Sequence, residues 1–244
     1  MAGHSKWNNI KRQKGAQDAK RAKIFTKIAR EMTVAVKEGG SSDPLNNTRL
    51  AAVIAKAKAA NMPNDNIKRT IEKAAGAGSG SSYEEVTYEG YGPNGVAVIV
   101  EAMTDNRNRI ASEIRLYFDK YGGKMGTSGC VSWSFDKKGV IIVDNSEGTL
   151  DEDTVLTHAL EADAQDVVAD GEVFVIYTDP DDFTVVNDKL IEEGYALLSA
   201  QVEMVPQNYV ALTDPADIKN MEKILDLMED NDDVQNVWHN FESE

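Results

Sequence analysis

The chain has 244 residues, 41% hydrophobic and 27% charged, a composition that excludes wholesale disorder and allows one large domain or a few small ones. The single cysteine, Cys130, excludes an intramolecular disulfide framework and a multi-cysteine zinc site. No apolar run approaches membrane-spanning length and the N-terminus lacks the apolar stretch of a secretory signal, so we expect a cytoplasmic protein without a membrane partner.

Charge is divided unevenly along the chain. The net charge is -15, yet residues 1–75 hold sixteen Lys or Arg and six Asp or Glu, while residues 76–244 hold ten and thirty-five. The first thirty residues alone carry nine Lys or Arg and one acid. A basic segment on an acidic protein favours contact with a polyanion, because neutralising phosphates releases counterions. We therefore predict that the N-terminal end binds nucleic acid.

Residues 1–14 form a basic arm, and three helices are predicted after it at 16–38, 43–60 and 65–75. Gly39-Gly40 ends the first helix and Asp43-Pro44 is the predicted start of the second. Each helix needs a partner for its apolar face, so we expect a small three-helix domain. The predicted apolar faces comprise Ile24, Ile28, Met32, Ala35 and Val36 in the first helix and Leu50, Val53, Ile54 and Ala57 in the second, and a basic stripe opposite the first face comprises Lys20, Lys23, Lys27 and Arg30.

Mixed structure is predicted after a linker at 76–82 (GAGSGSS), whose residues are small and uncharged. Strands are predicted at 86–90, 96–103 and 131–135, with a helix at 105–121 and a glycine-rich loop at 122–129. The buried side of that helix is predicted to carry Ile110, Ile114, Tyr117 and Tyr121.

The following stretch has βαββαβ order, which is typical of a ferredoxin-like domain. Its predicted strands lie at 139–143, 166–169, 172–178 and 195–204, and its helices at 151–162 and 182–193. After it come a strand at 209–212, a helix starting at Asp214-Pro215 with Ile218, Met221, Leu225 and Met228 on its apolar face, and a strand at 234–241.

We interpret the chain as α+β: an N-terminal three-helix domain followed by two ferredoxin-like α/β domains, one inserted in the other. The arm and helical domain comprise residues 1–75 and the linker residues 76–82. The discontinuous domain comprises 83–135 and 205–244, and the inserted domain comprises 136–204.

The basic arm and helix are the strongest functional signal. Lys and Arg on one helix stripe can contact successive phosphates, and Trp7 can stack on an unpaired base; the alternative is a solvated tail with Trp7 packed on the helical domain. Residues 104–109 lie where a strand leads into a helix, so free N–H groups and two arginines can bind an anion there, or the arginines pair with nearby acids. The predicted nucleic-acid-binding residues are Lys6, Trp7, Lys11, Arg12, Lys14, Lys20, Arg21, Lys23, Lys27, Arg30, Arg107 and Arg109.

No catalytic, metal or cofactor site is predicted. The glycine-rich loop matches no nucleotide-binding motif and is interpreted as a flexible connection. The acidic clusters at 151–153, 179–182 and 230–233 match no EF-hand loop; an alternative role is to repel non-specific nucleic acid and orient the basic end. His4, His158 and His239 have no accompanying nucleophile or metal motif, and His158 is interpreted as a helix-face residue. We therefore expect a protein that is not an enzyme.

Four long motifs cover much of the chain. They are MAGHSKWNNIKRQKGAQDAKRAKIFTKIAREM (1–32), NMPNDNIKRTIEKAAG (61–76), YEGYGPNGVAVIVEAMTDNRNR (88–109) and GGKMGTSGCVSWSFDKKG (122–139). Together they resemble the YebC/PmpR family over essentially the full length. The resemblance implies a cytosolic protein with a helical N-terminal domain and two α/β domains. Because no presequence precedes the first motif, the chain is similar to bacterial members rather than organellar ones.

The resemblance also implies a function. Members are transcriptional regulators that bind DNA, and others in the wider family are translation factors that act on the ribosome and relieve stalling at proline-rich sequences. The family's basic motif falls on Lys6, Trp7, Lys11, Arg12, Lys14, Lys20, Arg21, Lys23 and Lys27 of this chain.

The leading hypothesis is a DNA-binding transcriptional regulator that docks through its arm and first helix. A translation factor that binds the ribosome, or ribosomal or transfer RNA, is the alternative, because no helix-turn-helix reader or zinc finger is recognisable and RNA is read largely by shape and phosphate contacts. A third hypothesis is a small-ligand sensor or protein-interaction module built on the inserted domain.

Overall fold

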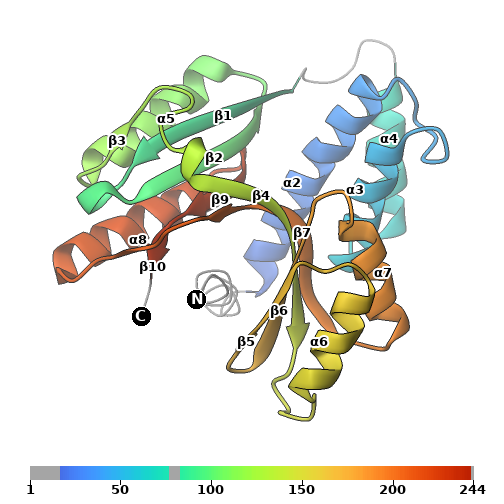
Figure 1. The fold of residues 1–244 in the computed structure, drawn as a ribbon. Helices are drawn as coiled ribbons and strands as arrows, with labels where there is room; N and C mark the ends of the chain where they lie inside the picture. Colours follow the sequence, from blue (N-terminus) through green and yellow to red (C-terminus); the bar gives the residue numbers. More distant parts are fainter. Residues whose placement is uncertain (1–16, 77–82, 243–244) are drawn as a thin grey trace. The chain divides into compact units, whose positions relative to one another are not determined.

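The computed structural model describes residues 17–76 and 83–242, with side chains from residue 21 onward. The described chain divides into two compact units (Figure 1). The first comprises residues 17–76, 83–131 and 213–237, and the second 132–212 and 238–242. A helical N-terminal region precedes antiparallel sheets with helices packed on them, which confirms the α+β class.

Three helices form the N-terminal part of the first unit: α2 (Gln17–Glu38), α3 (Thr48–Ala59) and α4 (Asn64–Ala75). The predicted apolar faces of α2 and α3 meet in one core, with one exception. Ile24 is 47% exposed, because the neighbouring Phe25, and not Ile24, is the residue of this turn that packs against the core. The buried members of this core are Ile28, Met32, Ala35, Val36, Leu50, Val53, Ala57, Met62, Ile67 and Ala74.

Helix α3 starts later than the sequence predicts, since its N-cap is Asn47 and not Asp43. The buried Asn47 side chain accepts a hydrogen bond from Leu50 N at 2.9 Å and donates to Ala35 O and Ser41 O, each at 2.8 Å. It therefore caps α3 and also binds one carbonyl in the last turn of α2 and one in the loop that follows. Asp43 caps the preceding turn instead, accepting from Leu45 N at 3.0 Å.

A four-stranded sheet follows, in the order β3-β1-β2-β9. Its elements are β1 (Glu84–Tyr91), β2 (Ala97–Thr104), β3 (Lys124–Met125) and β9 (Val234–His239), with helices α5 (Arg107–Lys120) and α8 (Pro215–Asp230). Strands β1 and β2 are antiparallel, joined through the short 3-10 turn Pro93–Gly95. Phe118, rather than Tyr117 or Tyr121, completes the buried side of α5, because the seam continues at four-residue spacing from Ile114. In α8 the buried residues are Met221, Ile224, Leu225 and Met228, and Ile218 is half-buried.

The second unit contains β4 (Phe135–Asp144), α6 (Glu152–Glu161), β5 (Asp166–Asp170), β6 (Val173–Thr178), α7 (Phe183–Glu192) and β7 (Leu197–Pro206). All neighbouring strands are antiparallel in the order β5-β6-β4-β7, the arrangement of a ferredoxin-like sheet. Helices α6 and α7 pack on one face, around Ile141, Val143 and Ile176. Short parallel strands β8 (Val210–Ala211) and β10 (Phe241–Glu242) pair separately.

The strand predicted at 131–135 is wrong. Residues Ser132–Ser134 form a 3-10 turn, Trp133 is 73% exposed, and only Phe135 belongs to a strand, β4. The buried Glu89 carboxylate accepts hydrogen bonds from Gly129 N at 2.7 Å and from Val131 N at 2.8 Å. These two backbone N–H groups therefore bind a side chain and not the backbone of a neighbouring strand, which explains why no strand forms here. The division into a separate helical domain and two nested α/β domains, with the boundaries predicted above, stays a proposal.

Candidate nucleic-acid interface

The predicted binding residues fall into three groups. The arm residues Lys6, Trp7, Lys11, Arg12 and Lys14 lie outside the described residues, as does the side chain of Lys20, whose backbone belongs to α2. Arg21 is exposed on α2. The remaining five, Lys23, Lys27, Arg30, Arg107 and Arg109, all contact acidic side chains or backbone carbonyls of the first unit.

The basic stripe of α2 contacts the C-terminal end of α8. Lys23 Nζ lies 2.6 Å from Asp230 Oδ1 and 3.3 Å from Asp230 O. One turn further along α2, Lys27 Nζ donates to Glu229 O at 3.2 Å. The last carbonyls of a helix have no intrahelical partner and carry the negative end of its dipole, so both ammonium groups occupy favourable positions.

Arg30 continues the same stripe and forms its most buried contacts. Its guanidinium donates to Asp232 O at 2.7 Å and Met103 O at 3.3 Å, and it forms an ion pair with the Asp233 carboxylate. The Arg30 side chain is only 16% exposed, and its guanidinium also lies 5.3 Å from the ring centre of Tyr83. Burial and the number of partners indicate that this residue holds the helices on the sheet.

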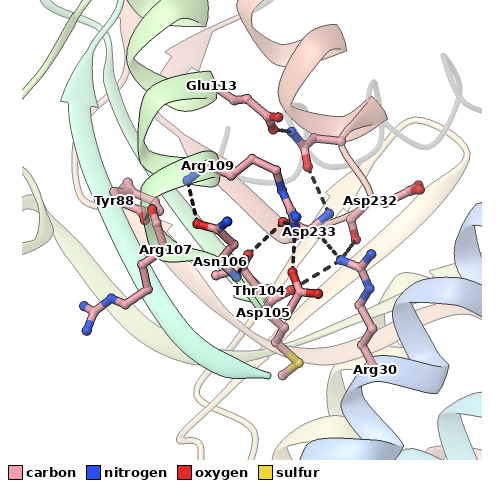
Figure 2. Close-up of polar contacts among 12 residues, drawn as sticks. Arg30, Tyr88, Thr104, Asp105, Asn106, Arg107, Arg109, Glu113, Asp232 and Asp233 are labelled. Carbon is pink, nitrogen blue, oxygen red and sulfur yellow. Dashed lines mark hydrogen bonds and ion pairs between the residues drawn. The ribbon is translucent and has the colours of Figure 1, made fainter. Parts of the chain in front are cut away.

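Asp233 is the centre of this polar cluster, shown in Figure 2. Its carboxylate also accepts hydrogen bonds from Thr104 Oγ1 at 2.8 Å and from Arg109 at 2.5 Å. The backbone N–H of Asp233 donates to Asn231 Oδ1, and the Asn231 amide donates to Glu113 at 2.7 Å. The cluster therefore joins α2, the end of β2, the start of α5 and the segment between α8 and β9.

The pKa values of Asp233 and Lys27 are shifted by this environment. Burial acts to raise the pKa of Asp233, but hydrogen bonds from Arg109, Thr104 and Arg30 outweigh it, so the pKa lies below its ordinary value. Burial also lowers the pKa of Lys27, against the opposing charges of Glu229 and Asp232. The carboxylate is thus stabilised in its charged form, whereas the lysine is desolvated.

The start of α5 is occupied by the protein's own groups. Asn106 caps the helix, accepting from Arg109 N at 3.1 Å, and the Arg109 side chain contacts Asp105 at 2.9 Å as well as Asp233. The Arg107 side chain is more exposed than that of Arg109, and its guanidinium lies 3.5 Å from the Glu84 carboxylate. This geometry corresponds to the alternative in which both arginines pair with nearby acids.

Two other groups singled out in the sequence contact neighbouring parts of the protein, and His4 lies outside the described residues. In the glycine-rich loop, a side chain at Gly123 would come within 2.7 Å of Tyr91 O, so this glycine allows close backbone approach within the protein. His158, on α6, has its Nδ1 2.9 Å from the Tyr195 hydroxyl. Within residues 17–76 and 83–242, no three His, Cys, Asp or Glu side chains converge as a metal site requires, and none of the helices is long and apolar enough to cross a membrane.

Sequence reasoning missed the role of Asp233 and Asn231. One local signal pointed to it: α8 ends in acidic residues and has no basic residue in its last turn, although a helix dipole favours cations there. The absence of a basic residue in this turn indicates that cationic side chains from another part of the chain contact the end of α8.

Comparison with known proteins places the chain in a family. Its residues 5–77 match the model described as "TACO1/YebC protein N-terminal domain", and residues 83–241 match "TACO1/YebC second and third domain". The chain belongs to the TACO1/YebC family. This confirms the resemblance found in the sequence motifs.

Relatives in this family match along their whole length. A protein of Acetivibrio thermocellus is 57% identical and one of Finegoldia magna 52% identical, each over 100% of both chains, and both are named "Probable transcriptional regulatory protein". A crystal structure of a conserved hypothetical protein from Aquifex aeolicus is 44% identical, covers 92% of this chain and 91% of its own, and superposes with a TM-score of 0.82.

Proposed function

We propose that this TACO1/YebC family protein regulates gene expression by binding nucleic acid, and that it is a DNA-binding transcriptional regulator rather than an enzyme. The observation that carries the proposal is the concentration of nine Lys or Arg in the first thirty residues of a chain whose net charge is -15. The names of the relatives from Acetivibrio thermocellus and Finegoldia magna support the transcriptional role.

Docking would begin with the arm and the first turns of α2. Arg21 is exposed and the Lys23 side chain is 39% exposed, so both are within reach of a phosphate. Arg30 and Arg109 have a buried partner in Asp233, and we assign them to positioning α2 and α5 rather than to phosphate contact. These contacts are mainly electrostatic and fix the position of the protein on the backbone. Selection of particular promoters would come from shape-specific or partner contacts of the α/β part of the chain.

Ultraviolet crosslinking in cells tests the proposal and separates it from its rival. The protein is recovered under denaturing conditions, samples are treated with DNase or RNase as controls, and the attached nucleic acid is sequenced. Discrete promoter DNA without RNA enrichment supports transcriptional regulation. Crosslinks concentrated in ribosomal or transfer RNA would instead make the protein a translation factor, and absence of any crosslinked nucleic acid would overturn both.

A further inference from the structure

The C-terminal end of α8 presents an anionic surface to the basic stripe of α2. We define residues 229–233 as the acidic corner. It combines two helix carbonyls that accept hydrogen bonds from α2, Glu229 O from Lys27 and Asp230 O from Lys23, with the carboxylates of Asp230, Asp232 and Asp233. Phosphate groups offer the same chemistry to a lysine: a negative charge and several acceptor oxygens.

We propose that the acidic corner is a built-in competitor of nucleic acid: it occupies Lys23 and Lys27 in the free protein and is displaced when a phosphate backbone binds. The inference rests on the proposed function, since it concerns the same basic stripe. It adds an autoinhibitory contact: a polyanion must displace the acidic corner before it can bind Lys23 and Lys27.

The contacts differ in how easily they can be displaced. Lys23 and Asp230 have side chains that are 39% and 75% exposed, and an ion pair of this kind contributes little to stability in water. Arg30, in contrast, pairs with the buried Asp233, whose carboxylate is also held by Arg109 and Thr104. The outer contacts can therefore open while the inner cluster keeps α2 on the sheet.

The arrangement has a consequence for selectivity. A ligand that contacts only one of the lysines gains less binding free energy than it would from an ammonium group with no other partner, because the carboxylate of Asp230 competes with it. A ligand that contacts the arm and several turns of α2 together offsets this competition. The acidic corner should therefore weaken short or non-specific contacts more than extended ones.

Binding of labelled nucleic acid to the full-length protein tests the inference. The variant Asp230→Asn/Asp232→Asn is compared with the native protein by fluorescence anisotropy, using a random DNA duplex and a random single-stranded RNA at about 150 mM KCl. We expect the variant to bind about three- to tenfold more tightly, the effect of losing the exposed ion pair between Lys23 and Asp230 and the nearby negative charge of Asp232. The matched control Asp119→Asn/Glu222→Gln removes two exposed carboxylates from α5 and α8 and should tighten binding by less than about twofold.

A double-mutant cycle identifies the contact itself. Lys23→Ala should weaken binding more in the Asp230→Asn background than in the native protein. In that background Lys23 has lost its ion-pair partner and can bind phosphate without competition. Equal losses in both backgrounds, or equal tightening in variant and control, would overturn the inference while leaving nucleic-acid binding intact. Failure of every protein to bind either probe would overturn the inference and count against the proposed function as well. Circular dichroism melting confirms that each variant is folded.

Discussion

Arg30 and Asp233 form an ion pair between residues 203 positions apart in the chain. The pair joins α2 to the segment that leads into β9, and Arg109 approaches the same carboxylate from α5. One acidic side chain thus holds together helices and a sheet that come from three separate parts of the sequence.

Asp233→Asn should destabilise the first unit by about 2–4 kcal/mol, because removing one partner of a buried pair leaves the other charges uncompensated. The upper part of the usual range is not expected, since the Arg109 side chain is 44% exposed and screened by water. Urea unfolding followed by circular dichroism measures the change. Asp232→Asn, at an exposed neighbouring position, is the control and should shift the unfolding free energy by less than about 0.5 kcal/mol. Equal effects of the two substitutions would contradict the assignment of Asp233 as the centre of the cluster.

The stabilising effect of Asp233 should depend on pH. Its pKa in the folded protein lies below the ordinary value of 3.8, so its contribution is present above that value and is lost as the pH falls through the folded pKa. The difference in unfolding free energy between the native protein and Asp233→Asn should therefore be constant from about pH 5 to 7 and shrink below about pH 4. Urea titrations across this range measure it. A difference that stays the same down to about pH 2.5 would show that the charge of Asp233 is not what stabilises the fold.

Ile28→Asp should unfold the helical core, at a cost of about 4 kcal/mol or more, because it buries an unpaired charge at a position that is 2% exposed. Ile24→Asp is the matched control, since Ile24 lies one turn earlier on α2 and is half-exposed; it should cost less than about 1 kcal/mol. Thermal melting of both variants tests the face assignment. Similar melting temperatures for the two would refute it.

Replacement of Lys20, Lys23 and Lys27 by Ala should flatten the salt dependence of nucleic-acid binding. Each lost phosphate contact lowers the slope of log K against log salt concentration by about 0.7–0.9. The folded structure should persist, because the helical core does not include these lysines. Anisotropy titrations at several KCl concentrations measure the slope, with Lys189, Lys219 and Lys223 replaced together as the charge-matched control. A native slope in the Lys20, Lys23 and Lys27 variant would show that this stripe does not contact phosphate.

The helices and strands were largely predictable because periodicity is a local property of sequence. The spacing of Ile28, Met32 and Ala35 predicts a buried helix face, and the βαββαβ order of the second unit predicts its sheet. Two of the errors occur where a distant group supplies a hydrogen bond. Asn47 rather than Asp43 caps α3, because its amide also reaches the end of α2, and Glu89 turns residues 129–131 away from a strand.

The class of fold, the family and the uneven distribution of charge depend on residue types in their order along the chain, so they can be read without coordinates. Which of the basic residues have partners depends on the folded structure. Lys23, Lys27 and Arg30 form one stripe in sequence, yet Arg30 is paired with a buried carboxylate while Lys23 meets an exposed one. The strength and accessibility of an ion pair depend on burial and on neighbouring donors. Here the acidic partners lie more than two hundred residues from the basic stripe, and the donors Arg109 and Thr104 lie 124 and 129 residues from Asp233, so local sequence does not reveal them.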